Sequence, residues 1–250
     1  MSPYFLSAAE MEQVMRTALL PSLQRIQPEA VYFYGTGCRS AGNVAVVRKA
    51  LKRVFPSATV AVTHDLFGAA RALCGDNKGV ACILGTGSNS CYFNGKRIVR
   101  NSSGLGFVLG DEGSGAYLGR MVLQHYLNNI FEDDLKQRFD QKYRVTPAEI
   151  MENVYKKPLP NRYLASFAAF LSENRGHYMI ENILEDGLND FFSLHIACYP
   201  ESSRYPVHFT GSIAYYFSDV VLGLCDQYGF HPGLILQAPM EGLVRYHRSH

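Results

Sequence analysis

Two short segments combine glycines with hydroxyl and acidic side chains in a pattern suited to holding a phosphorylated ligand. Residues 85–89 read Gly-Thr-Gly-Ser-Asn, and residues 110–114 read Gly-Asp-Glu-Gly-Ser. Glycines let successive backbone N–H groups face a phosphate at close range, and a neighbouring hydroxyl can add a hydrogen bond. Carboxylates instead accept hydrogen bonds from ligand hydroxyl groups. We therefore expect a phosphate cradle at 85–89 that faces an acidic site at 110–114.

The first segment is expected to form a turn between two strands. Residues 79–84 are a short apolar run, and the sequence after the turn contains Asn94-Gly95, which predicts a hairpin. The same Gly-Thr-Gly tripeptide occurs at 35–37 after another apolar run. An ordinary tight turn also explains such a tripeptide, so this alternative stays open for either one.

The second segment precedes a predicted helix, in which Leu118, Val122 and Leu127 recur with helical spacing. One explanation is that the acids and Ser114 cap this helix and complement its dipole. Capping accounts for one acid but not for so many glycines, each of which costs about 1 kcal/mol in a helical stretch. A close backbone approach to a ligand would account for them.

A third candidate, Asp65, follows the predicted strand 59–62 and precedes an alanine-rich helix. An isolated Asp at such a place can serve as the helix N-cap. The carboxyl end of a strand in an open α/β sheet is also where ligands bind, and a carboxylate there can act as a general base toward a substrate hydroxyl. Both interpretations of Asp65 stay open on the sequence.

In this order and spacing, the chain resembles one family along its length from about Pro3. It is similar to N-acetylglucosamine kinase-type members of the actin, sugar-kinase and heat-shock-protein ATPase superfamily, which are grouped with the activating ATPases of benzoyl-CoA reductase. The matching segments are 63–65, 85–89, 104–106, 110–114 and 209–214.

The resemblance implies a ribonuclease H-like (actin-like ATPase) α/β fold with two lobes. Residues 1–77, with the C-terminal helix 240–250 packed back on them, would form an incomplete N-terminal lobe. Residues 78–239 would form the C-terminal lobe.

The resemblance also implies a role for each matching residue in transferring phosphate from ATP to N-acetylglucosamine or a related hexose. Asp65 would be catalytic, accepting the proton of the 6-hydroxyl as that oxygen attacks the γ-phosphate. The sugar would contact Ser88, Asn89, Gly104, Leu105, Gly106 and Asp111. The nucleotide would contact Gly85, Thr86, Gly87, Gly211, Ser212 and Ala214. Relatives can carry an aromatic residue where this chain has Leu105. Mg²⁺ would arrive with ATP, and no protein ligand to it is assigned.

The 250 residues depart from the family at their start. Such kinases begin with a strand and an acidic, glycine-rich first phosphate loop that ends in Thr-Lys-Thr and holds magnesium, whereas this sequence opens on Met1 and a helix that begins at Ser7 and reaches about Leu23. We therefore expect impaired phosphoryl transfer. One alternative is a catalytically inactive sugar- or nucleotide-binding regulator. Another is an activator-type ATPase, for which the cysteine spacing gives no support.

The amino-acid composition argues against some classes of partner but does not indicate a function. The 250 residues carry 24 basic and 22 acidic side chains, a formal net charge of +2, which gives no reason to expect nucleic acid or a membrane surface as partner. The six cysteines show no C-x-x-C spacing and predict reduced, mostly buried thiols in a cytoplasmic protein. The expected partner is a small sugar, and a homodimer stays open.

The apolar pattern predicts the elements that must position these residues. Strands are expected at 31–34, 59–62, 80–84 and 207–209, alternating with helices in an α/β arrangement. Residues from about 110 to 199 are expected to be almost wholly helical, with a capping box at 146–149. A single helix is expected from Ile213 to Tyr228, and a short one at 240–246.

Overall fold

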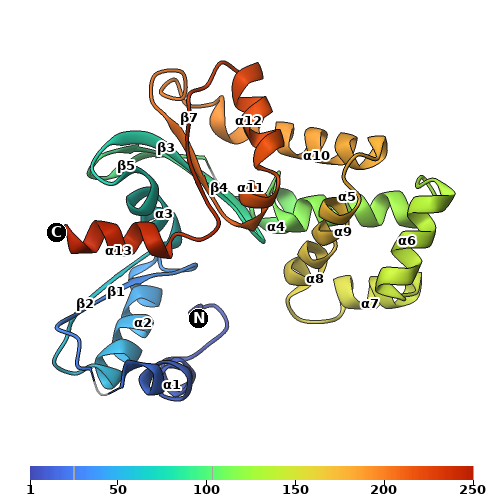
Figure 1. Ribbon diagram of the computed structural model, residues 1–250. Helices are drawn as coiled ribbons and strands as arrows, with labels where there is room; N and C mark the ends of the chain where they lie inside the picture. The colour runs from blue at the N-terminus through green and yellow to red at the C-terminus, as the bar shows by residue number, and fades with distance from the viewer. Residues whose placement is uncertain (25, 103, 250) are drawn as a thin grey trace. The chain divides into compact units, whose positions relative to one another are not determined.

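The computed structural model describes residues 1–24, 26–102 and 104–249. The chain divides into two compact units, Met1–Ala69 and Ala70–His250 (Figure 1). Helix α3, Asp65–Cys74, crosses this division. The lobe assignment made from the sequence, with its boundary after residue 77, stays a prediction.

The first unit opens with a helical stretch that begins at a capping box. The Glu10 N–H donates to Ser7 Oγ at 3.3 Å, and the Glu10 carboxylate accepts the Ser7 N–H at 2.7 Å. Helical structure then continues without interruption through α1, a π-helical turn and a 3₁₀ turn (Ala8–Val14, Met15–Leu19 and Leu20–Leu23). The predicted helix reaching Leu23 is confirmed.

The sheet of the first unit has two parallel strands among the described residues. Strand β1, Ala30–Tyr34, pairs with β2, Thr59–Thr63, and helix α2, Ala41–Val54, connects them. The core between the helices and the sheet is apolar and includes Met11 and Leu51. Both strands confirm the sequence pattern.

The second unit is built on a mixed five-stranded sheet in the order β5-β4-β3-β6-β7. Strands β3, β4 and β5 form an antiparallel meander, whereas β6 and β7 run parallel to β3. Their bounds are Lys78–Leu84, Ser88–Asn94, Ile98–Asn101, Val207–Thr210 and Pro232–Leu236. Strand β7 was not expected from the sequence, because it begins with Pro-Gly and shows no clear alternation.

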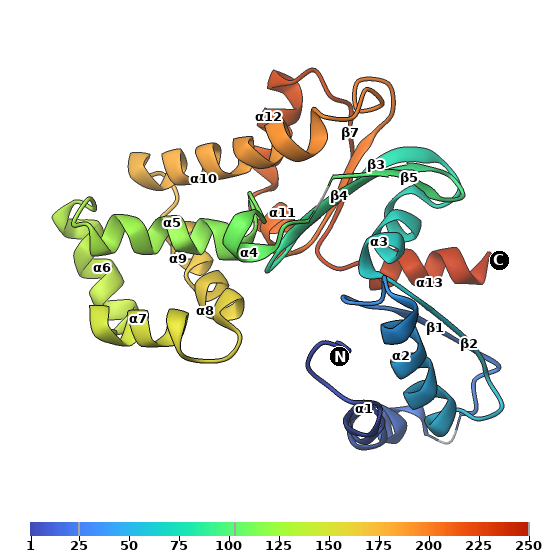
Figure 2. The same cartoon turned by 180° about the vertical axis from the view of Figure 1, so that it is seen from behind.

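Helices occupy almost all of the chain between β5 and β6, as expected. The long helices α5 and α10 pack against each other (Figure 2). A cluster of buried phenylalanines, including Phe139, Phe167 and Phe191, fills the space among these helices. The helices are α4 Gly106–Leu109, α5 Gly115–Leu127, α6 Asp133–Tyr143, α7 Pro147–Tyr155, α8 Pro160–Ser166, α9 Ala168–Glu173, α10 Tyr178–Phe191 and the π-helical η3 Phe192–Ile196.

The single helix predicted from Ile213 to Tyr228 is wrong. Phe217 has φ −113° and ψ 34°, which lies outside the helical range and separates α11, Ser212–Tyr216, from α12, Ser218–Gln227. The Phe217 ring is buried in the core of the unit, so tertiary packing overrides the helical pattern at this residue. The short C-terminal helix is present as α13, Met240–Arg248.

The cysteines are free thiols, and five of the six are buried; Cys198 is exposed. Burial raises the pKa of Cys74 to about 12 and raises that of Cys82 well above its ordinary value. Such thiols stay protonated and unreactive at neutral pH. Within the described ranges, no helix is both long and apolar enough to cross a bilayer.

Candidate active site

The glycine turn between β3 and β4 rests on the beginning of helix α5. The N–H groups of Gly115 and Ala116 donate to the carbonyl oxygens of Gly85 and Thr86 at 2.8 and 3.0 Å. The first N–H groups of a helix have no partner within the helix, so the carbonyl oxygens of the turn serve as acceptors for the first N–H groups of α5. The two segments that the sequence singled out therefore form one structure in the second unit.

A second glycine turn follows β6 and lies against the same place. Gly211 has φ 121°, and a Cβ at this residue would lie 2.2 Å from the Leu84 carbonyl oxygen and 3.0 Å from Gly85 N. Only glycine permits this conformation and this approach. Ser212 then begins α11 on the surface, whereas Ala214 of the same helix is fully buried in the core.

Two hydroxyl groups at these turns are buried without a hydrogen-bond partner among the described residues. They are Ser88 Oγ and Thr210 Oγ1, in side chains of residues 8% and 2% exposed. Ser88 pairs with Leu84 and Thr210 pairs with Ile83, so the two hydroxyls flank the end of β3. Leaving a buried polar group unsatisfied costs about 1–3 kcal/mol, which a ligand with acceptor or donor oxygens would recover.

The Asp111 carboxylate lies on the glycine turn. A Cβ at Gly87 would come within 2.9 Å of Asp111 Oδ2, and the Ser88 N–H donates a hydrogen bond to this carboxylate. Burial raises the pKa of Asp111 above its ordinary value, and the Ser88 hydrogen bond opposes that shift. Asp111 also has φ 57°, in the left-handed region that Asp tolerates better than most residues.

The N-cap of α5 is Ser114, which accepts the Tyr117 N–H at 3.1 Å. Asp111 and Glu112 both precede the cap. The capping explanation therefore fits Ser114 and leaves the two acids available for other contacts.

Glu112 belongs to a partly buried hydrogen-bonded chain that the sequence did not indicate. Its Oε2 lies 2.7 Å from His195 Nε2, and His195 Nδ1 lies 2.5 Å from Ser102 Oγ. These three side chains come from the loop before α5, from η3 and from the residue after β5. No local spacing could have found them, because 83 residues separate Glu112 from His195.

The other residues predicted to contact the sugar, Asn89 and the turn 104–106, also lie close together. Asn89 Oδ1 accepts the Asn101 side-chain N–H at 2.9 Å, and a Cβ at Gly104 would lie 3.5 Å from Asn89 Nδ2. Leu105 follows with 59% of its surface exposed, and Gly106 has φ 76° at the start of α4. The second unit therefore brings Asn89 to the turn 104–106.

Asp65 lies in the first unit, where it contacts the other Gly-Thr-Gly turn. The Thr36 hydroxyl donates to Asp65 Oδ2 at 2.9 Å, and Asp65 Oδ1 accepts the Leu66 N–H at 2.9 Å. The turn at 35–37 is therefore more than a chain reversal, since it orients a carboxylate. Sequence reasoning did not include Thr36 among the site residues.

His64, not Asp65, caps helix α3 with its side chain. The Phe67 N–H donates to His64 Nδ1 at 3.3 Å. Burial and the nearby Arg39 lower the pKa of His64, which keeps the ring neutral and Nδ1 able to accept. The N-cap alternative for Asp65 is thereby weakened, and one of its oxygens is oriented by Thr36 instead.

Among the described residues, one group of side chains has the spacing of metal ligands: Glu132, Asp134 and His177. His177 Nε2 lies 3.4 Å from the Glu132 carboxylate and 3.7 Å from that of Asp134. However, His177 Nδ1 accepts the Met179 N–H at the start of α10, so a neutral ring carries its proton on Nε2. That proton faces the carboxylates and explains the cluster without a metal.

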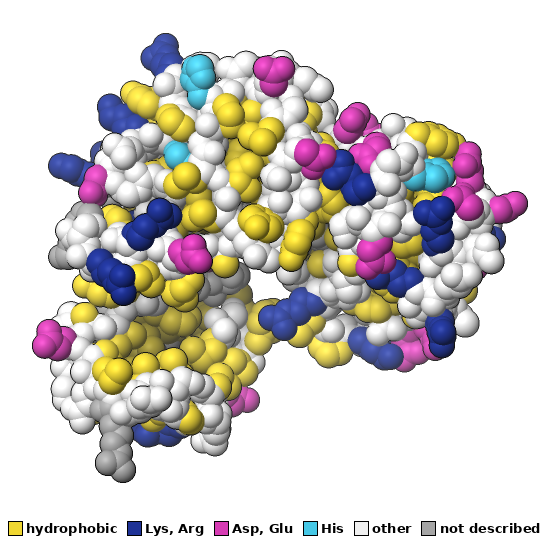
Figure 3. Space-filling view, viewed as in Figure 1, with side chains coloured by type: hydrophobic (Ala, Val, Ile, Leu, Met, Phe, Trp, Pro, Cys, Tyr) yellow, Lys and Arg dark blue, Asp and Glu magenta, His cyan; other side chains and the backbone are white. Residues whose placement is uncertain are grey.

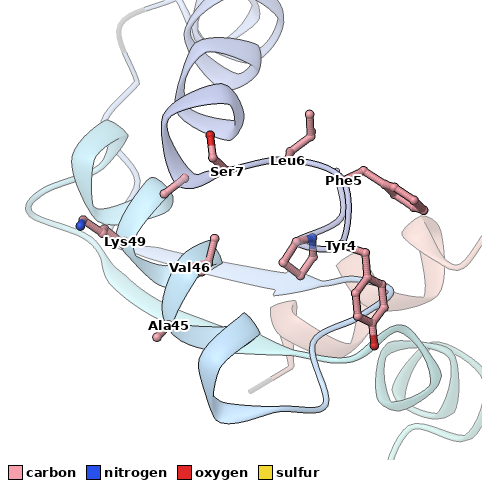
Figure 4. A pocket seen from close by; sticks show the side chains of 9 residues that line it. Tyr4, Phe5, Leu6, Ser7, Ala45, Val46 and Lys49 are labelled. Carbon is pink, nitrogen blue, oxygen red and sulfur yellow. The ribbon is translucent and has the colours of Figure 1, made fainter.

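Each unit has a surface hollow, and neither is lined by the glycine turns. The hollow of the first unit has a volume of about 540 Å³ and lies between the segment Pro3–Ala8 and the α2 residues Ala45, Val46 and Lys49 (Figure 4). Hydrophobic side chains cover much of the neighbouring surface (Figure 3). The hollow of the second unit, about 260 Å³, lies between the end of α3 and α13. The residues of the glycine turns therefore lie outside these two hollows.

Comparison with solved structures gives close similarity. A proposed N-acetylglucosamine kinase from Porphyromonas gingivalis is 38% identical, with a TM-score of 0.95 over 100% of this chain and 89% of that one. A proposed N-acetylglucosamine kinase from Chromobacterium violaceum is 20% identical, with a TM-score of 0.71 over 96% of this chain and 85% of that one.

A more distant similarity is to a ROK family glucokinase from Streptomyces griseus, solved with glucose and AMPPNP. It is 17% identical, with a TM-score of 0.52 over 96% of this chain and 87% of that one, and supports the fold alone. A scan of family models and a search of curated proteins gave no match.

Proposed function

Because the chain belongs to the N-acetylglucosamine kinase-type sugar kinases, with their actin-like ATPase fold, we propose that it transfers the γ-phosphate of ATP to the 6-hydroxyl of N-acetylglucosamine or a related hexose. The observation that carries this proposal is the packing of the Asp111 carboxylate on the Gly85–Gly87 turn. A hydroxyl-binding acid and a phosphate-binding turn then share one place. Phosphoryl transfer from a nucleotide to a sugar requires that the two ligands bind next to each other.

The nucleotide phosphates would bind at the turns 85–87 and 211–212. The Gly85 and Gly211 N–H groups bond to the Gly87 and Leu236 carbonyls, so the remaining N–H groups of these turns, together with the unpartnered hydroxyls of Ser88 and Thr210, would supply uncharged donors in a confined place. Donors of this kind stabilise charge that develops on a transferring phosphoryl group. Ala214 would contribute by packing behind the second turn.

The sugar would bind between Asp111 and the turn 104–106. Asp111 accepts hydrogen bonds from ring hydroxyls, and Asn89 offers an amide N–H beside Gly104. Leu105, which is largely exposed, would supply an apolar wall for the sugar face. This set is neutral apart from Asp111, as suits an uncharged hexose.

The general base would be Asp65. Thr36 fixes one carboxylate oxygen by hydrogen bonding, which leaves the carboxylate oriented at the end of β2. We propose that residues 1–77 with α13 form one lobe and residues 78–239 the other, so that the base and the turns come from different lobes.

Magnesium would enter bound to the nucleotide phosphates and neutralise their charge. Mg²⁺ is usually held by one or two carboxylates together with phosphate oxygens and water. Asp111 is assigned to the sugar and Glu112 is engaged by His195, so neither acid of the segment 110–114 is assigned to the metal. We expect the 250 residues to transfer phosphate slowly, because they contain no first phosphate loop ending in Thr-Lys-Thr.

Incubation with magnesium ATP and N-acetylglucosamine, followed by ³¹P NMR, tests the proposal. The expected product is the sugar 6-phosphate, formed slowly by the 250 residues and faster when a family first phosphate loop is supplied. Saturable sugar binding with no product in either form would favour the inactive regulator. The activator-type ATPase has less support, since Cys198 is the one exposed cysteine and cannot alone hold a cluster.

A further inference from the structure

We infer that His195 is a positioning residue that holds the two sugar-facing turns at a fixed spacing. For the identity of the ligand this inference rests on the proposed function, whereas the link itself rests on side-chain geometry. His195 lies in η3, Phe192–Ile196, and is 8% exposed. It is one of few buried polar side chains in the unit, and a buried polar group is retained only with partners.

Both ring nitrogens of His195 are engaged, and each leads to a different turn. Nε2 lies 2.7 Å from the carboxylate of Glu112, the residue next to Asp111. Nδ1 lies 2.5 Å from the hydroxyl of Ser102, which stands two residues before Gly104. One imidazole therefore joins the acidic loop to the glycine turn that faces Asn89.

The chemistry of the partners sets the proton positions. An ionised carboxylate can only accept, so Nε2 carries a proton and donates to Glu112. In the neutral ring Nδ1 then accepts from the Ser102 hydroxyl. Glu112 thus selects the tautomer that can hold Ser102, as a second partner commonly does for a histidine. Removing the carboxylate would loosen both bonds.

The ring is itself held firmly. The His195 carbonyl oxygen accepts the Ser90 hydroxyl at 2.6 Å, and Tyr199 OH accepts the Ser102 N–H at 2.5 Å. The Phe191 ring lies 5.2 Å from the imidazole, centre to centre. The π-helical geometry of η3, with the Ala197 N–H bonded to the Phe192 carbonyl, is of a kind often found at functional sites. These contacts make His195 a rigid spacer.

A change in this spacing would be transmitted to Asp111. Asp111 and Glu112 share a peptide bond, and Asp111 is held at φ 57° against Gly87. A displacement of about 1 Å in a group that positions a ligand can lower the rate of the catalysed reaction by about 10²-fold. The expected effect falls on sugar binding, because the hydrogen bonds of His195 lead to Ser90, Ser102 and Glu112 and not to the proposed phosphate-binding turns 85–87 and 211–212.

Calorimetric titrations of His195→Ala, His195→Gln and His195→Asn test the inference. The Ala variant should bind N-acetylglucosamine at least about tenfold more weakly and a non-hydrolysable ATP analogue within about twofold of the unaltered protein. Gln offers a polar group near the place of Nε2 and Asn near that of Nδ1, so each should restore part of the sugar affinity. His125→Gln is the matched control, since His125 is half-buried about 15 Å along α5 from Gly115.

An Ala variant with unchanged sugar affinity and only a lower melting temperature would overturn the inference. Equally weaker binding of N-acetylglucosamine and of the ATP analogue in all three variants would overturn it too. If the unaltered protein binds no hexose, the proposed function fails, and hydrogen exchange decides the link. Faster amide exchange at 104–114 in His195→Ala would support it, and unchanged exchange there would overturn it.

Discussion

Both units contain a strand, a glycine turn, a helix and a parallel strand in that order, and among the described residues only the second unit adds a hairpin with a second glycine turn. In the first unit the Gly35 N–H donates to the Thr63 carbonyl at the end of β2, and in the second the Gly211 N–H donates to the Leu236 carbonyl at the end of β7. In both units a glycine that follows one strand therefore donates to the end of the neighbouring parallel strand.

We propose that this difference gives the two units different chemistry. The five-stranded sheet carries the β3–β4 hairpin, whose turn at 85–87 meets Gly211 and Asp111. The described sheet of the first unit has two strands, and its turn at 35–37 meets a carboxylate instead. A single glycine turn positions an acid, whereas two turns beside one another can surround a phosphate.

The largest expected effect concerns the acid of the first unit. In protein that phosphorylates the sugar, Asp65→Asn should lower kcat by about a hundredfold or more, because a positioned general base contributes about that much. The Asn oxygen can still accept the Leu66 N–H, and its amide N–H can donate to the Thr36 hydroxyl, so the fold should survive. Steady-state kinetics check this, and near-normal turnover would reduce Asp65 to the first residue of α3.

A smaller effect is expected where the two turns meet in the second unit. Gly87→Ala places a Cβ where it would lie 2.9 Å from Asp111 Oδ2, so the carboxylate must move. Overpacking of this kind costs about 1–3 kcal/mol, and sugar affinity should fall by about tenfold.

The matched control for Gly87 is Gly223→Ala in helix α12, where a Cβ would meet nothing within 4 Å. That variant should gain about 0.5–1 kcal/mol of stability and keep its sugar affinity. Equal sugar affinity in both variants, measured by calorimetry, would break the proposed link between the turn and the acid.

The smallest expected effect is a change in the pH dependence of stability. Since burial raises the pKa of Asp111, the folded protein binds a proton more tightly than the unfolded chain does. The contribution of Asp111 to stability is therefore greatest below its ordinary pKa and falls as pH rises through the raised one. Asp111→Asn should remove this fall, so its melting temperature should decline less than that of the unaltered protein across the same range. Parallel curves would contradict the shift.

Elements with local signals were predicted from the sequence, and long-range contacts were not. The capping boxes at Ser7 and Thr146, the hairpin turn at Gly95 and the strand at 80–84 depend on residues a few positions apart. The break at Phe217 and strand β7 depend on packing that no local pattern records.

The candidate site follows the same rule. The glycines and Asp111 stand out by composition, so their neighbourhood could be inferred. The contact of Thr36 with Asp65 spans 29 residues, and that of Ser102 with His195 spans 93. Such pairs become visible only when the sheet has brought the strand ends together.

Calorimetric titration of N-acetylglucosamine into the protein tests most directly whether Asp111 of the second unit binds the sugar while Asp65 of the first unit acts only as the base. The account predicts saturable binding that Asp111→Ala weakens by about 1.5–3 kcal/mol, the range for hydrogen bonds to a charged group, and that Asp65→Asn changes much less. Binding that is lost in Asp65→Asn and kept in Asp111→Ala would contradict it, as would no binding by the unaltered protein.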